Sequence, residues 1–183
     1  MVEINVSQLL KAPIGSTRTY KVNEVVEITD GDTMVQGEVT LLRTDRSILA
    51  RGALHAQVEL TCSRCLVSYS CPLVLNIEEE YFPKTDIITG ASLPVPEESG
   101  FFTINERNIL DLTEAIRQYA LMAIPIKPLC DEACAGLCPT CGRNLNQGPC
   151  ECHVEPADPR WSELGKLVLV DREASPSKQK GTN

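Results

Sequence analysis

The sequence has few aromatic residues and no long hydrophobic run. Only 4% of its 183 residues are aromatic while 43% are apolar, so we expect a core of Val, Leu, Ile and Ala side chains. No run approaches the roughly eighteen apolar residues that a membrane-spanning helix needs. Residues 1–6 also lack the basic and apolar segments of a signal peptide. We therefore expect a cytoplasmic protein without a membrane partner.

Enzyme motifs are missing as well. The chain has no glycine-rich phosphate loop, and its two histidines form no Ser/His/Asp arrangement that the spacing supports. The acidic run at residues 78–80 is most simply explained as the solvated end of a strand. We expect neither an enzyme nor a small-molecule substrate.

Positive charge is scarce. The chain carries 17 basic and 25 acidic residues, a formal net charge of −8, which does not favour a broad electrostatic contact with nucleic acid. Several basic residues gather near the C-terminus: Arg160, Lys166, Arg172, Lys178 and Lys180. A local contact there with RNA or an acidic protein surface competes with the simpler interpretation of a solvated tail.

Cysteine, by contrast, is abundant. Six of the nine cysteines lie between residues 130 and 152, and two more form the motif Cys62-Ser-Arg-Cys65. Thiols persist in a reducing cytoplasm, and an odd count leaves one cysteine unpaired, so the pattern favours metal over disulfides. Sites saturated by cysteine are structural. The sequence predicts two structural Zn²⁺ ions held by Cys62, Cys65, Cys130, Cys134, Cys138, Cys141, Cys150 and Cys152.

The spacing indicates how these eight thiolates divide. Cys138-Pro-Thr-Cys141-Gly142 has the tight turn of a zinc knuckle, and Cys150-Glu-Cys152 follows it closely, so we favour one local site from these two motifs. The pair at residues 62 and 65 would then meet the pair at residues 130 and 134 in a second site.

Other arrangements of the cysteines stay open. A rival partition joins the two Cys-x-x-Cys motifs, as in a zinc ribbon. A single metal with spare thiols, an iron–sulfur cluster and a ligand role for His153 are further alternatives.

Alternating apolar and polar residues predict strands over the first eighty residues. One hairpin is expected between residues 20 and 41. The alternation is cleanest from Leu54 to Leu60 and resumes from Val67 to Ile77, which places the first cysteine pair at a hairpin tip. Cys71 falls on the apolar face and is expected to be a buried core residue rather than a ligand.

Apolar residues then recur at helical spacing over residues 108–124, with Asn108 as the expected N-cap. A further helix is expected to open at Asp158-Pro159. The predicted fold class is α+β: an antiparallel β-rich N-terminal body with one amphipathic helix, followed by a cysteine-rich, zinc-stapled C-terminal segment. The expected organisation is a body at 1–128, a metal-binding segment with a final helix at 129–171, and a disordered tail at 172–183.

Three stretches of the chain resemble the YceD family, the large ribosomal RNA subunit accumulation proteins of bacteria and plastids. They are Leu60-Thr-Cys62-Ser-Arg-Cys65-Leu66, residues 128–146, and Gly148-Pro-Cys150-Glu-Cys152. The likeness covers nearly the whole chain, including the helix between the motifs and Asp158-Pro159-Arg160. The resemblance implies a non-enzymatic factor in accumulation or assembly of the large ribosomal subunit (23S rRNA), with a ribosomal RNA or a ribosomal protein as its partner.

Two other functions are compatible with the cysteines. A thiol redox or zinc-switch protein would use the Cys-x-x-Cys pairs, but such chemistry favours an exposed cysteine at a helix N-terminus, and neither pair is placed there. Delivery of zinc to a ribosomal zinc ribbon is the other.

Overall fold

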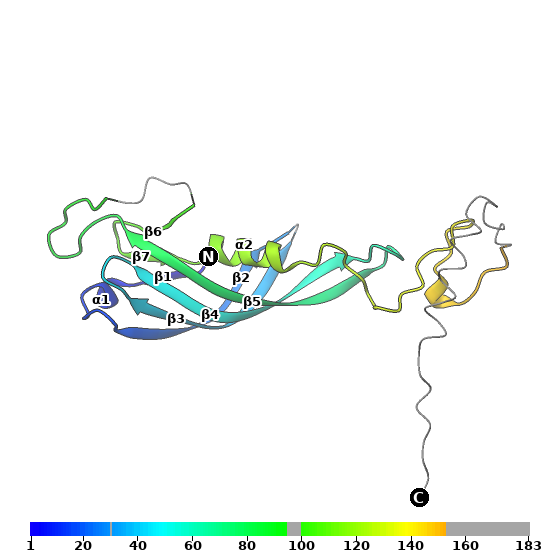
Figure 1. Ribbon diagram of the computed structural model, residues 1–183, viewed down its shortest axis with the longest axis horizontal. Helices are drawn as coiled ribbons and strands as arrows, with labels where there is room; N and C mark the ends of the chain where they lie inside the picture. The colour runs from blue at the N-terminus through cyan, green and yellow to red at the C-terminus, as the bar shows by residue number, and fades with distance from the viewer. Residues whose placement is uncertain (30, 95–99, 153–183) are drawn as a thin grey trace, which may run out of the picture. The chain divides into compact units, whose positions relative to one another are not determined.

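The computed structural model describes residues 1–29, 31–94 and 100–152, which are drawn in colour in Figure 1. The chain divides into two compact units, Met1–Cys134 and Ala135–Asn183. The helix expected at Asp158 and the tail at 172–183 lie outside the described residues. The domain boundaries expected from the sequence stay a prediction.

A five-stranded sheet dominates the first unit. Its order is β2-β3-β4-β5-β6, built from Thr17–Glu27, Asp32–Arg43, Ile48–Thr61, Ser68–Pro83 and Phe102–Ile104. The first four strands are antiparallel neighbours, whereas β6 pairs in parallel with the end of β5. The predicted β-rich body of an α+β fold and both predicted hairpins are therefore confirmed.

The sheet is apolar on one face, as its alternating sequence requires. Val35, Leu54 and Leu75 from three successive strands are each almost fully buried on this face. Cys71 lies there too, 8% exposed, and belongs to the same apolar core as expected.

Helix α2 (Thr113–Ala123) packs against this apolar face (Figure 1). It contributes Ala115, Ile116 and Ala120 to the core. Its Tyr119 hydroxyl lies at the edge of β5, where it donates to the carbonyl oxygen of Glu78 at 3.1 Å and accepts from the amide of Glu78 at 3.3 Å. The hydroxyl thereby satisfies backbone groups that a neighbouring strand would otherwise pair with.

The start of α2 differs from the prediction. Asn108 adopts a left-handed φ of 58° in a turn, and the next residues form β7 (Ile109–Asp111), paired with β1 (Glu3–Asn5). The helix therefore begins at Thr113, whose amide donates to the Asp111 carboxylate at 2.8 Å. Pairing with the N-terminal strand overrides the local helical spacing of residues 108–112.

Two short helices complete the described elements: α1 (Ser7–Leu10) in the first unit and the 3₁₀ helix η1 (Leu145–Gln147) in the second. Within the part of the chain that the structure describes, no helix has the length and apolar character to cross a lipid bilayer.

Candidate metal centres

The eight predicted ligand cysteines lie in two groups of four, and within each group all sulfur atoms are within 4.8 Å of one another. We call the first the hairpin cluster: Cys62, Cys65, Cys130 and Cys134. We call the second the local cluster: Cys138, Cys141, Cys150 and Cys152. This is the grouping that the sequence spacing favoured, and not the ribbon-like rival.

The sulfur spacing fits a tetrahedral metal ion. Ligands about 2.3 Å from a tetrahedral Zn²⁺ are about 3.8 Å from one another, whereas a disulfide needs about 2.05 Å. In the hairpin cluster the sulfur of Cys62 lies 3.8 Å from that of Cys134, and the sulfur of Cys65 lies 3.5 Å from that of Cys130. Donor type, number and spacing therefore all suit a metal ion, although metal binding itself stays a prediction.

The hairpin cluster stands on the tip of the β4–β5 hairpin, whose last strand pair is Thr61 with Ser68. The turn is held by two backbone bonds, from the Cys62 amide to the Val67 carbonyl and from the Leu66 amide to the Cys62 carbonyl, both 3.0 Å. Leu66 has a left-handed φ of 58°. Strand pairing and these two bonds thus position the turn that carries the first two sulfurs.

The local cluster uses the same turn. The Cys138 amide donates to the Arg143 carbonyl at 2.8 Å, and the Gly142 amide donates to the Cys138 carbonyl at 2.9 Å, with Gly142 at a φ of 72°. Both turns therefore have the same backbone bonds and a left-handed residue directly after the second cysteine. Glycine adopts that conformation without the steric cost that leucine bears.

Backbone amides aimed at sulfur lower the pKa of one cysteine in each turn. The amides of Cys130 and Cys65 act on Cys62 and bring its pKa from 9.0 to about 6. The Cys141 and Thr140 amides do the same for Cys138, whose pKa is also lowered to about 6. Hydrogen bonds to a thiolate favour the charged form, which is the form that binds metal.

Another cysteine in each cluster has a raised pKa instead. The thiol of Cys130 lies against Cys65, and the thiol of Cys152 lies against Cys141, and these contacts raise both pKa values to about 12. A metal ion that binds either cluster must therefore displace protons from these thiols.

Arg64 was not singled out in the sequence, yet it joins the two halves of the hairpin cluster. Its guanidinium donates to the carbonyl of Cys134 at 2.8 Å and to that of Glu132 at 3.4 Å, and its amide donates to the Cys62 sulfur at 3.5 Å. The neighbouring Ser63 amide donates to the Pro128 carbonyl at 2.8 Å. In the sequence Arg64 is simply a residue between two cysteines, and nothing there indicates that its side chain bonds to carbonyl groups about seventy residues away.

Asparagines organise the local cluster in a similar way. The Asn146 side chain accepts from the Ala135 amide at 2.7 Å, and the Asn144 side chain accepts from the Asn146 amide at 3.0 Å. His153, the alternative ligand, lies outside the described residues.

The sheet with a cysteine pair at its hairpin tip, and the two sets of four cysteines, define a class of small β-rich proteins with two cysteine-only clusters that could each hold a metal ion. A family model described as large ribosomal RNA subunit accumulation protein YceD matches residues 50–168, a range that contains both clusters. The chain belongs to the YceD family, as its motifs indicated.

One of the individual relatives carries the family name. The chain is similar to the chloroplastic "Large ribosomal RNA subunit accumulation protein YCED homolog 1" of Arabidopsis thaliana, with 28% identity over 165 residues, 79% of this chain and 51% of the relative. An uncharacterized protein of Mycobacterium tuberculosis strain H37Rv is 27% identical over 145 residues, 79% of this chain and 67% of that protein. The chain thus spans about half the length of the chloroplast relative. No solved structure matches it.

Proposed function

We propose that this chain is a non-enzymatic structural zinc protein of the cytoplasm that assists accumulation or assembly of the large ribosomal subunit. The observation that carries the structural role is the completeness of both clusters. Four thiolates fill a tetrahedral coordination sphere, so no position is left for a substrate or a reactive water. Family membership supports the ribosomal part, because the family is described by large-subunit ribosomal RNA accumulation.

Zinc is the metal that the turns favour. The Cys138-Pro-Thr-Cys141-Gly142 sequence and the matching backbone bonds at Cys62 form two knuckles that offer amide donors to the sulfurs. Such donors help thiolates carry their charge around a divalent ion. Bound zinc would supply a structural cross-link between the cysteines of each cluster. Counting zinc and iron per chain in protein purified without added metal tests this proposal, and two zinc ions are expected.

The ribosomal role is tested by deletion and complementation. A strain that lacks the protein should contain less large-subunit ribosomal RNA, and the wild-type chain should restore it. A chain with Cys62→Ser should restore less of it, and Cys71→Ser is the matched control for cysteine loss, because Cys71 is a core residue outside both clusters. Unchanged large-subunit RNA in the deletion strain would contradict the ribosomal proposal.

A thiol redox or zinc-switch role is the second candidate, and the lowered pKa of Cys62 and Cys138 favours it. A redox protein should react quickly with a thiol reagent while its metal is bound. A structural protein should react only after a chelator is added. Thiol titration of the metal-loaded chain separates the two functions.

A further inference from the structure

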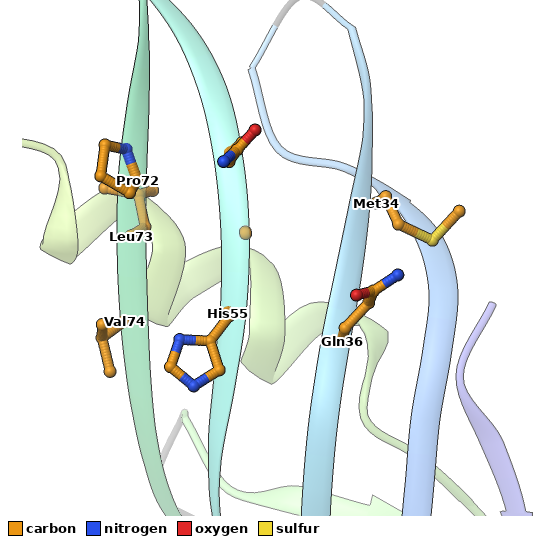
Figure 2. Close-up of a pocket in the computed structure, with 8 residues that line it drawn as sticks. Met34, Gln36, His55, Pro72, Leu73 and Val74 are labelled. Carbon is orange, nitrogen blue, oxygen red and sulfur yellow. The ribbon is translucent and has the colours of Figure 1, made fainter.

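The face of the sheet opposite α2 is exposed. One row across it consists of Asn23, Gln36, His55 and Val74, which are partners in successive strand pairs and are all exposed. Figure 2 shows His55 and Val74 side by side on this face, with α2 behind the strands.

The row crosses a shallow hollow of about 600 Å³. Met34 and Val74, both on its lining, are 48% and 54% exposed, so the hollow offers apolar side chains to a ligand. A second hollow of about 430 Å³ shares Gln57 with the first and is lined by Asp32 and Glu59. An apolar patch and an acidic patch are therefore continuous on this face.

The face carries more negative than positive charge. Along β2 to β5 its outward side chains include two cations, Lys21 and Arg51, against six carboxylates: Glu27, Asp32, Glu38, Glu59, Glu78 and Glu80. Arg51 is already paired with Glu78 at 2.5 Å. Glu27 and Asp32 stand directly opposite each other on β2 and β3, an arrangement of like charges that destabilises a sheet unless a cation lies nearby.

We propose that this open sheet face docks a cationic, extended segment of a protein. An apolar side chain of the segment packs against Met34 and Val74, and its Lys or Arg side chains lie against Glu27, Asp32 and Glu59. The acidic charge disfavours an RNA backbone as the occupant, because phosphates are repelled by the same carboxylates that attract the cations. The hollow is open rather than enclosed, which suits a polymer segment better than a small molecule.

This inference deepens the proposed function and rests on it for the source of the partner: a basic segment of a large-subunit ribosomal protein. The probe is a set of fluorescent synthetic peptides that tiles these proteins, mixed with the full metal-loaded chain and followed by anisotropy. We expect cationic peptides to bind, with an affinity that falls as salt is raised. Neutralising the acidic patch as E27Q/D32N/E59Q should weaken binding roughly tenfold, as for three exposed ion pairs.

A second variant and a control separate docking from folding. M34S/V74S removes the apolar contacts at exposed positions and should weaken binding several-fold without changing the unfolding temperature. The control E3Q/D45N/E106Q removes the same number of exposed carboxylates elsewhere on the first unit and should leave the affinity unchanged.

Three results would overturn the docking proposal: absence of peptide binding, equal binding by E27Q/D32N/E59Q and wild type, or binding of large-subunit RNA that M34S/V74S abolishes. The ribosomal role is judged separately by the deletion strain. If that strain loses large-subunit RNA while no peptide binds, the docking proposal alone fails.

Discussion

The two cysteine clusters share one turn geometry but differ in what holds them. The hairpin cluster joins residues that are 65 to 72 positions apart, and three of its four cysteines are buried. The local cluster lies within residues 138–152, in a unit whose described elements amount to one short 3₁₀ helix, and only Cys138 is buried. A sheet positions half of the first cluster in advance, whereas the second has little besides its own turns and asparagines. The same ligands should therefore contribute differently to folding.

Removing the metal is the strongest way to expose this difference. With a chelator, we expect residues 135–152 to lose their structure, because binding of about 10–16 kcal/mol per structural zinc exceeds any stability these few contacts provide. Strands β2 to β5 should stay folded on their own core. Hydrogen exchange with and without chelator measures both, and equal loss of protection in the sheet would contradict the comparison.

Single cysteine substitutions sharpen the comparison further. C62S and C138S should each reduce the bound metal from two ions to one, which native mass spectrometry counts. C138S should leave the unfolding temperature of the sheet unchanged, while C62S should lower it, because a cluster ligand at the hairpin tip is lost. C71S is the control that keeps both ions, since Cys71 lies outside the clusters.

Lowering the pH should weaken metal binding in both clusters alike, since each cluster has one thiol with a pKa near 6. Above that pH, Cys62 and Cys138 are already thiolates in the metal-free chain, so the metal need not displace protons from them. As the pH falls through about 6 these two cysteines also bind protons, so each cluster must then release one more proton per metal. Chelator competition between pH 5 and pH 8 should show metal affinity falling more steeply below about pH 6. A constant slope would contradict the lowered pKa values.

Arg64 gives a test that is confined to the hairpin cluster. R64A removes the bonds to the Cys134 and Glu132 carbonyls, and we expect this cluster to release its metal roughly fivefold faster, equivalent to about 1 kcal/mol for an exposed charged donor. Peptide-level alkylation during chelation identifies which cysteines become reactive. R143A, at an exposed position next to the other turn, should leave the hairpin cluster unaffected. If R64A also released metal faster from the local cluster, the effect would not come from the contacts that Arg64 makes in the hairpin cluster.

The smallest effect is expected at the left-handed residue of each turn. Leu66 is 64% exposed, so L66G loses little packing and relieves a backbone conformation that costs a non-glycine residue roughly 1–2 kcal/mol. Glycine's greater freedom in the unfolded chain offsets about 0.5–1 kcal/mol of this gain. We expect a slightly raised unfolding temperature for L66G, and faster metal loss from the local cluster in G142A. Calorimetry and chelation kinetics measure the two changes.

The β4–β5 hairpin and the grouping of the cysteines were predictable from the sequence, because both depend mostly on residues that are close together in the chain. Alternation from Leu54 to Ile77 gave the β4–β5 hairpin, and with it the position of Cys62 and Cys65 at the tip. The grouping of the cysteines followed from their spacing once that tip was placed. These features depend on residues close in sequence, where period and turn chemistry carry the information.

The features that were missed depend on distant partners. The pairing of β1 with β7 joins residues 3–5 to residues 109–111, and neither segment is long enough to show a period. The parallel contact of β6 with β5 and the carbonyl partners of Arg64 are likewise set by the packed fold. Such contacts leave no signal in a short window of sequence.

The distance along the chain between Cys62 and Cys134 has a mechanical consequence. Once a metal joins them, the 72-residue interval between these cysteines becomes a closed ring that contains β5, β6, β7 and α2. Pulling on the two ends of the protein then cannot extend this interval until a metal–sulfur bond breaks, which hides about 250 Å of contour length. The coordination bonds would thus shield β5, β6, β7 and α2 from the force, whereas β2, β3 and β4, which precede Cys62, would still bear it.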